Sequence, residues 1–140
     1  MKKFVVDASV AVKWFIPEIH SAAAVRLLEP QIVLCAPDLI GPEVGNTLWK
    51  KVRRGEIERD EAGEILEAFG KVPIEIYPSN VLLPAAFDLA TALDRSVYDS
   101  LYVALAVAQD CVLVTGDRKL HSALAASAVA RHVGWIEEEL

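Results

Sequence analysis

The chain has 140 residues, of which 54% are hydrophobic, and carries a formal net charge of -6 with a pI near 5.0. This length is typical of a single domain, 1–140, and the hydrophobic content is ample for a packed core, which argues against disorder. The acidic balance argues against a protein that simply coats nucleic acid. It remains compatible with a metal-dependent nuclease, because a bound cation reverses the local charge of a site.

The sequence carries no sign of export or membrane insertion. Lys2 and Lys3 are followed almost at once by Asp7, which is unlike a signal peptide, and no apolar run reaches the ~18 residues of a membrane span. Cys35 and Cys111 are the only cysteines, both in apolar runs, and we expect them to be buried free thiols. A reducing, cytoplasmic compartment fits this pattern.

Short apolar runs alternate with helical patterns along the whole chain, and this alternation predicts an α/β fold with a parallel sheet. The predicted strands are 3–6, 31–36, 72–77, 111–115 and, with the weakest pattern, 128–133. The predicted helices are 8–16, 20–29, 38–54, 58–71, 81–94, 98–110 and 118–124.

Three of these helices have distinctive features. Asp38 is predicted to be the N-cap of the third helix, with Gly41 delaying its regular start to Pro42 and Gly55 ending it. The third and fourth helices should form a hairpin across 55–57. The helix 98–110 is apolar nearly all round and should be buried.

Three acidic residues stand where strands meet helices or where the buried helix begins. Asp7 follows the first strand directly, at the edge of a parallel sheet where ligands bind. Asp117 follows the fourth strand, and Asp99 lies three residues after Ser96 in a possible capping box. Taken singly, helix capping explains each of them at least as well as a functional site does.

Glu43 is harder to explain as a structural residue. It lies along an apolar helix stripe that includes Leu39, Ile40 and Val44, so it points along the margin of that stripe or into it. A glutamate there is uncommon unless it is paired or bound to a metal ion. Asn46 lies one turn further on the same face and would orient Glu43 or a substrate oxygen.

If the four acids converge, their repulsion must be offset. Two unit charges ~4 Å apart repel by about 4 kcal/mol at an effective dielectric of ~20. Protons or a divalent cation can supply the offset, and oxygen-only ligands favour Mg²⁺ or Mn²⁺. Zinc is not indicated, because His20, His121 and His132 are scattered and neither cysteine has a partner at ligand spacing.

Four motifs, in order, resemble the PIN domain family, and within it the VapC-type toxin ribonucleases of toxin–antitoxin modules. They are Val5-Val6-Asp7-Ala8-Ser9 with Lys13-Trp14, then Glu43-Val44 with Asn46, then Tyr98-Asp99-Ser100-Leu101-Tyr102-Val103-Ala104-Leu105-Ala106, and finally Val114-Thr115-Gly116-Asp117. Each motif is weak alone, but the four span nearly the whole chain.

This resemblance implies a three-layer sandwich in which a central parallel sheet is flanked by helices. It also implies that Asp7, Glu43, Asp99 and Asp117 cluster at one sheet edge, bind Mg²⁺ or Mn²⁺ as the catalytic metal ligands and cleave RNA. A VapC-like toxin would be a homodimer held inactive by a small antitoxin protein. Two alternatives remain, a non-catalytic PIN-like module that binds nucleic acid or protein, and a phosphatase with Asp7 as nucleophile. The phosphatase is disfavoured because Ser9 stands where a second acid is usual.

Further residues are candidates for supporting roles. The hydroxyls of Ser9 and Thr115 are suited to bond the acids or a bound water, although local turn bonding explains them equally well. Lys13 could meet an RNA phosphate or simply form a solvated helix end. Lys50 and Arg54 continue the line of Glu43 and Asn46 on one helix face and form a candidate RNA-binding patch. Stabilisation of the helix C-terminus would explain part of that cluster.

The three tryptophans, Trp14, Trp49 and Trp135, are better explained by packing than by base stacking.

Overall fold

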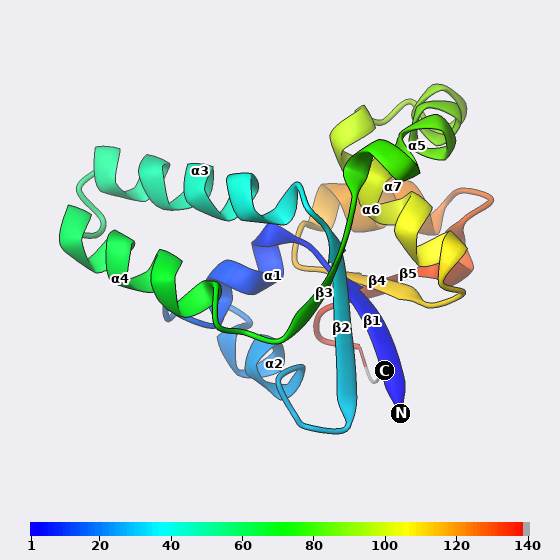
Figure 1. Ribbon diagram of the computed structural model, residues 1–140. Helices are drawn as coiled ribbons and strands as arrows, with labels where there is room; N and C mark the ends of the chain where they lie inside the picture. The colour runs from blue at the N-terminus through cyan, green and yellow to red at the C-terminus, as the bar shows by residue number, and fades with distance from the viewer. Residues whose placement is uncertain (139–140) are drawn as a thin grey trace.

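The computed structural model describes residues 1–138 and contains a five-stranded, wholly parallel sheet in the order β3-β2-β1-β4-β5 (Figure 1). The first strand lies at the centre because later strands add on both of its sides. This arrangement confirms the predicted α/β fold with a parallel sheet. The strands are β1 (Lys2–Val6), β2 (Ile32–Pro37), β3 (Ile74–Tyr77), β4 (Val112–Thr115) and β5 (Val133–Trp135).

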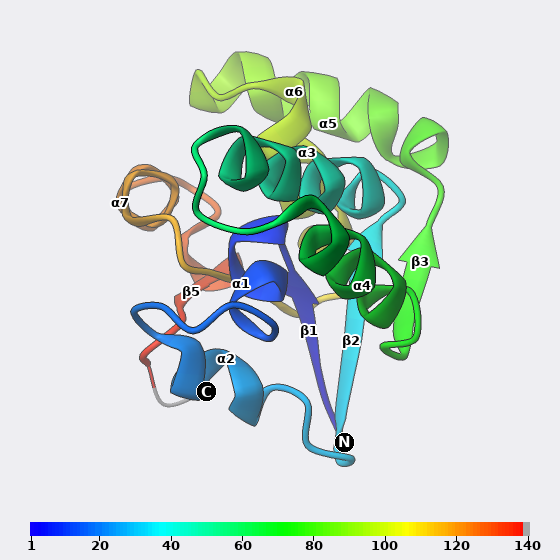
Figure 2. The ribbon, with the colours of Figure 1, turned by 90° about the vertical axis from the view of Figure 1, so that its left-hand side faces the viewer.

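Helices cover both faces of the sheet, which completes the expected three layers. Helices α1 to α4 lie on one side, and α5 and α6 lie on the other (Figures 1 and 2). None of the helices within residues 1–138 is long and apolar enough to cross a membrane. The helices are α1 (Ala8–Lys13), α2 (Ser21–Arg26), α3 (Ile40–Arg53), α4 (Arg59–Phe69), α5 (Ser79–Leu93), α6 (Val97–Ala108) and α7 (Arg118–Ala125).

Helix α6 forms the centre of the second layer, as its sequence predicts. Every residue from Ser100 to Ala106 is buried, because one side of α6 packs on β1, β2 and β4 while α5 packs on it from outside. Parallel strands covered on both faces are apolar throughout, and Val5 and Val6 are fully buried. The core therefore fixes the position of α6 relative to the end of β1.

The start of α3 differs from the prediction. Asp38 is not its N-cap. Its carboxylate instead accepts hydrogen bonds from the amide and hydroxyl of Ser79, which joins the end of β2 to the start of α5. Pro42 is the third residue of α3 and not the first, and it is tolerated there because first-turn N–H groups have no partner within the helix. The predicted end is confirmed, since Gly55 follows the C-cap with φ 73°.

The fifth strand exists, but the predicted span 128–133 is wrong. Ala130–His132 forms a 3-10 turn, and the strand begins only at Val133, which pairs with Leu113 of β4. His132 is buried in this turn with Nδ1 2.9 Å from the carbonyl oxygen of Cys111. The turn is set by this long-range contact, which the local pattern does not reveal.

The tryptophans and cysteines follow the sequence prediction in part. Trp14 donates to the carbonyl of Ala24, and Trp135 is buried, so packing explains both. Trp49 is 53% exposed, so the packing prediction is wrong for this residue. Cys35 and Cys111 are free thiols, the first buried and the second half-buried.

Candidate active site

The sheet register brings Asp7 and Thr115 together. Val6 of β1 pairs with Val114 of β4, so the next residue on each strand projects beyond the same edge of the sheet. The Thr115 hydroxyl donates to Oδ2 of Asp7 at 2.6 Å, and both residues are buried. The two strands thereby define the base of the site.

The Asp7 carboxylate accepts two more hydrogen bonds through its other oxygen. Oδ1 accepts from the Ser9 hydroxyl at 2.5 Å and from the Val10 amide at 3.2 Å, which makes Asp7 the N-cap of α1. Burial raises the pKa of Asp7, these hydrogen bonds oppose that shift, and the negative charge of Asp117 adds to it. Asp7 is thus both a helix cap and a buried acid whose ionisation is disfavoured.

The same two hydroxyls also hold the turn that carries Asp117. Ser9 Oγ accepts from the Gly116 amide at 3.1 Å, and Thr115 Oγ1 accepts from the Asp117 amide at 3.0 Å. Asp117 then caps α7, because its Oδ1 accepts from the Leu120 amide. The two hydroxyls therefore connect one acid to the backbone that positions another.

Glu43 reaches the site from the first turn of α3. Its Oε1 accepts a hydrogen bond of 2.5 Å from the hydroxyl of Tyr102, which is buried on α6. Burial raises the pKa of Glu43, and the negative charges of Asp7 and Asp99 add to that shift. Burial, with the adjacent Glu43, also raises the pKa of Tyr102, so its hydroxyl remains a donor.

Asp99 lies in the first turn of α6 and has a cationic partner. Its amide donates to the Ser96 hydroxyl at 3.0 Å, so Ser96 caps the helix. This is one of the two hydrogen bonds of the predicted capping box. The carboxylate Oδ2 of Asp99 instead lies 3.1 Å from Nη2 of Arg95. Arg95 therefore neutralises part of the negative charge that Asp99 adds to the site.

The four acids lie at one edge of the sheet and form an electrostatic series. The negative charge of Asp117 adds to the raised pKa of Asp7, and the negative charges of Asp7 and Asp99 add to the raised pKa of Glu43. As the side chains stand, no three His, Cys, Asp or Glu residues within 1–138 are close enough together to hold a metal ion. The structure thus brings the acids to one edge without closing them into a ligand cage.

The donor chemistry of the series nevertheless suits a hard cation. Glu43, Asp99 and Asp117 each have one carboxylate oxygen that accepts no hydrogen bond from the described residues. Oxygen-only ligands with excess negative charge are what Mg²⁺ and Mn²⁺ prefer. A divalent cation at this edge would relieve the repulsion that, after burial, adds to the raised pKa of Asp7 and of Glu43.

The candidate RNA-binding cations differ in their surroundings. Lys13 is not a solvated helix end, because its side chain is 10% exposed, packs against Gly116 and forms an ion pair with Glu18 at 3.1 Å. Lys50 and Arg54 are exposed and make no ion pair within residues 1–138. Asn46 is exposed in the same groove as Glu43, to which it makes no hydrogen bond.

Sequence reasoning gave no role to two residues that contact the acids. The signal for Arg95 was available, since it precedes Asp99 by four positions, the spacing of a helical ion pair. The contact of Tyr102 with Glu43 spans 59 positions and could not be read from local spacing.

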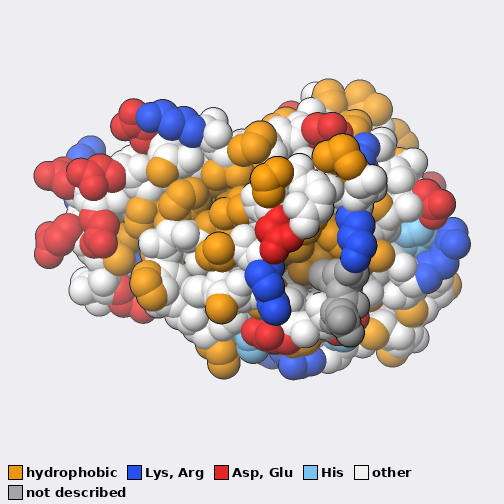
Figure 3. All heavy atoms as spheres, turned by 90° about the horizontal axis from the view of Figure 1, so that it is seen from below, with side chains coloured by type: hydrophobic (Ala, Val, Ile, Leu, Met, Phe, Trp, Pro, Cys, Tyr) orange, Lys and Arg blue, Asp and Glu red, His pale blue; other side chains and the backbone are white. Residues whose placement is uncertain are grey.

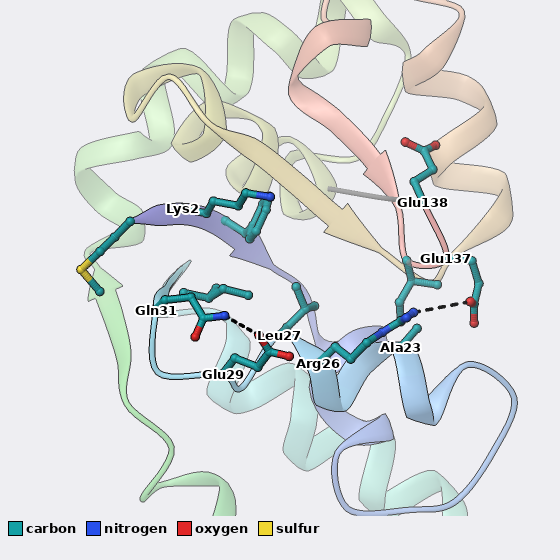
Figure 4. A pocket seen from close by; sticks show the side chains of 12 residues that line it. Lys2, Ala23, Arg26, Leu27, Glu29, Gln31, Glu137 and Glu138 are labelled. Carbon is teal, nitrogen blue, oxygen red and sulfur yellow. Dashed lines mark hydrogen bonds and ion pairs between the residues drawn. The ribbon is translucent and has the colours of Figure 1, made fainter.

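A larger hollow, of about 900 Å³, lies at the opposite edge of the sheet and is separate from the acids (Figure 4). Its floor includes Phe4, Leu27 and Ile136, and its charged rim is paired in part, with Arg26 3.9 Å from Glu137. This underside carries mixed charges, with acidic side chains gathered at the end where the α3–α4 hairpin lies (Figure 3). The glutamates that line the hollow each have a neighbouring side-chain partner: Gln31 for Glu29, His20 and Arg26 for Glu137, and His121 for Glu138.

The raised pKa of Glu43 predicts how stability depends on pH. A carboxyl group whose pKa is raised on folding costs stability when it is ionised, and this cost disappears as the pH falls through that pKa toward the ordinary value of 4.5. In EDTA, Glu43→Gln should therefore melt higher than the wild type at pH 7, with a difference that shrinks as the pH approaches 4.5. Thermal unfolding at several pH values tests this, with Glu64→Gln on the exposed face of α4 as the control. A wild-type advantage at pH 7 would contradict the expected repulsion.

Comparisons with known proteins agree with the fold and identify the family. The PIN domain family model matches residues 4–125. The chain is 38% identical to ribonuclease VapC3 of Pyrobaculum aerophilum over 120 residues, which cover 84% of this chain and 92% of that protein. The crystal structure of PAE2754 from the same organism superposes with a TM-score of 0.68 at 25% identity, covering 87% of this chain and 79% of that one. A chain of a toxin–antitoxin complex from Klebsiella pneumoniae has the same fold, with a TM-score of 0.63 at 14% identity and coverage of 96% and 98%. The chain belongs to the PIN domain family, among the VapC ribonucleases.

Proposed function

We propose that this protein is an endoribonuclease that hydrolyses RNA phosphodiesters with Mg²⁺ or Mn²⁺, and that it acts as the toxin of a type II toxin–antitoxin module. The observation that carries the proposal is the buried Asp7, which faces further acids at one sheet edge of a chain from the VapC family. A cap or a structural ion pair does not require so many negative charges together.

The residues of the site would have three different roles: binding the cation, positioning the acids and contacting the substrate. Asp7, Glu43, Asp99 and Asp117 would hold the cation, which shields the phosphodiester and lowers the pKa of a bound water. Ser9 and Thr115 keep Asp7 and the turn carrying Asp117 in place through their hydroxyls. Asn46 lines the same groove as Glu43 and would meet a substrate oxygen there.

The substrate would approach along α3. Lys50 and Arg54 lie on this path and make no ion pair within residues 1–138, and the Lys13 side chain lies against Gly116 next to Asp117. The protein is acidic as a whole, so affinity for RNA must come from such local charge and from the cation.

Asp7 and Asp117 do cap helices, and this observation supports the alternative of a non-catalytic PIN-like module that binds nucleic acid or protein. The ribonuclease proposal predicts that Asp99→Asn and Glu43→Gln lower RNA cleavage by more than about 100-fold, the upper end for partners of metal ligands. Both variants should also weaken Mn²⁺ binding measured by calorimetry. Asp110→Asn, at an exposed acid beyond α6, is the matched control.

The alternative predicts a different result for Asp7→Asn and Asp117→Asn. A non-catalytic module would show no Mn²⁺-dependent cleavage in the wild type, and loss of either cap would only cost about 1 kcal/mol of stability. Full cleavage by Asp99→Asn, or by the wild type in EDTA, would eliminate the metal-dependent mechanism.

The basic patch gives a second prediction. Lys50→Ala combined with Arg54→Ala should weaken RNA binding for all sequences and leave Mn²⁺ binding unchanged, because phosphate contacts carry little sequence information. The slope of log affinity against log salt should flatten by about 0.7 for each lost contact. Filter binding across a salt series measures both quantities.

The control for the patch is Arg59→Ala with Lys71→Ala, two exposed cations on and after α4. If Lys50 and Arg54 only complement the C-terminal end of α3, their loss would cost about 0.3–1 kcal/mol each and RNA affinity would not change. Unchanged affinity at low salt would remove the patch from the mechanism.

A small antitoxin protein would inhibit this site. Its inhibitory segment would lie over the α3–α4 hairpin and reach the acids with an arginine or lysine, since a cation from the partner fits the same negative charges. The fold shared with a chain of a toxin–antitoxin complex supports such a partner.

The protein would also form a homodimer, and the apolar side chains exposed on α5 are the best surface for it. Val81, Leu83 and Phe87 are 75%, 44% and 59% exposed on this helix. Light scattering at tens of micromolar should give about twice 15.3 kDa, and Phe87→Glu should give the monomer. Leu66→Glu, on the exposed face of α4, should leave the dimer intact. A wild-type monomer at this concentration would contradict the dimer.

A further inference from the structure

Two grooves on α3 meet at Lys50 and form one path that leads away from the acids. The first, of about 350 Å³, includes Glu43, Asn46 and Tyr98 in its lining. The second, also about 350 Å³, is lined by Trp49, Lys50, Arg53 and Arg54. We call this path, through both grooves, the α3 groove.

The α3 groove has an exposed aromatic ring in each of its halves. Tyr98 is 63% exposed, and its hydroxyl makes no hydrogen bond to the described residues although Tyr98 directly precedes Asp99. Trp49 is 53% exposed, and its ring contacts a cation, with the Arg53 guanidinium 5.2 Å from the ring centroid. Neither ring has the packing that explains the half-buried Trp14 and the buried Trp135.

The charges around these rings complement a nucleic acid backbone. Lys50 lies between the two grooves, and neither it nor Arg54 is engaged by an acid within residues 1–138. Exposed aromatic rings interleaved with unpaired cations are the combination that binds single strands, because every base has a face that can stack. An acidic peptide would use the cations and would leave the two flat rings without a matching group.

The spacing also suits a short piece of single strand. Glu43 and Trp49 are six residues apart on α3, or about 9 Å along the helix axis. At roughly 3.4 Å per stacked nucleotide this distance corresponds to two or three nucleotides. Bases in an RNA duplex are stacked on each other and paired, so they could not reach the rings.

We propose that the α3 groove is a base-stacking site for single-stranded RNA, in which one base stacks on Tyr98 beside the acids and another stacks on Trp49, with Lys50 and Arg54 contacting the phosphates between and beyond them. This inference rests on the proposed ribonuclease function and names the two side chains on which bases of its substrate would stack.

The test measures binding in EDTA, where cleavage plays no part. The probes are a 12-nucleotide oligouridine and an abasic ribose-phosphate chain of the same length. Trp49→Ala and Tyr98→Ala should each weaken oligouridine binding by roughly tenfold and leave binding of the abasic chain unchanged. Lys50→Ala should weaken binding of both probes by the same factor. Trp49→Phe and Tyr98→Phe keep a ring and should retain most of the affinity.

Tryptophan fluorescence gives an independent readout. Oligouridine should quench the emission of the wild type, and this quenching should be lost in Trp49→Phe although the affinity is retained. Equal affinities of wild type and Trp49→Ala for oligouridine would overturn the proposal, as would an equal loss for the abasic chain. A twelve-base-pair RNA duplex that binds as tightly as oligouridine and depends on Trp49 would also overturn it.

Failure of this inference is separable from failure of the proposed function. Ring-dependent binding in EDTA by a protein that does not cleave RNA with Mn²⁺ would leave the stacking site intact and remove the nuclease. Cleavage with Mn²⁺ that shows the same KM in wild type and Trp49→Ala would leave the nuclease intact and remove the stacking site.

Discussion

The buried carboxylate of Asp7 is the constraint on which the rest of the site depends. Burying a charge is expensive unless hydrogen bonds compensate for it, and Asp7 accepts three, from Ser9, Val10 and Thr115. The hydroxyls of Ser9 and Thr115 also accept hydrogen bonds from the backbone amides of residues 116 and 117. The ends of β1 and β4 are therefore joined by one hydrogen-bond network. The hydrogen bonds that allow Asp7 to be buried therefore also hold this half of the site in place.

The other half of the site is carried by helices. Glu43 is held by Tyr102 of α6, and Asp99 by Arg95 in the turn before α6, so both of these acids take their position from the packing of α6 under the sheet. Helix α6 is fixed by its buried face, while these two side chains each keep one oxygen without a partner among residues 1–138. Within residues 1–138 the acids share an edge without forming a cage, since each is held by partners of its own.

Sequence and structure agree where local chemistry determines the outcome. The strand–acid–helix junctions at Asp7 and Asp117 follow from apolar runs that end in a capping residue, and their positions were predictable. The start of α3 was not, because Asp38 is used by Ser79, which lies 41 positions away. The position of the last strand was missed for the same reason, since the buried contact of His132 with Cys111 sets the turn before it. The side-chain partners of Glu43 likewise lie on another helix. Local patterns thus predicted where the acids stand relative to strands and helices, while tertiary packing determined how they are held.

Charge separation resolves the apparent conflict between an acidic protein and an anionic substrate. Much of the excess negative charge is carried by α4 and the residue before it, at Glu58, Asp60, Glu61, Glu64 and Glu67, all of them exposed. The neighbouring end of α3 is basic, with Lys50, Lys51, Arg53 and Arg54, although Lys51 is drawn to Glu18 at 3.6 Å. The field that a substrate meets is set by groups within about a Debye length, ~8 Å at physiological ionic strength. An RNA strand on α3 would therefore meet the cations of that helix first, while most of the charge on the outer face of α4 is screened from it. The hairpin thus allows a protein with a net charge of -6 to offer a cationic path that leads to a cluster of acids.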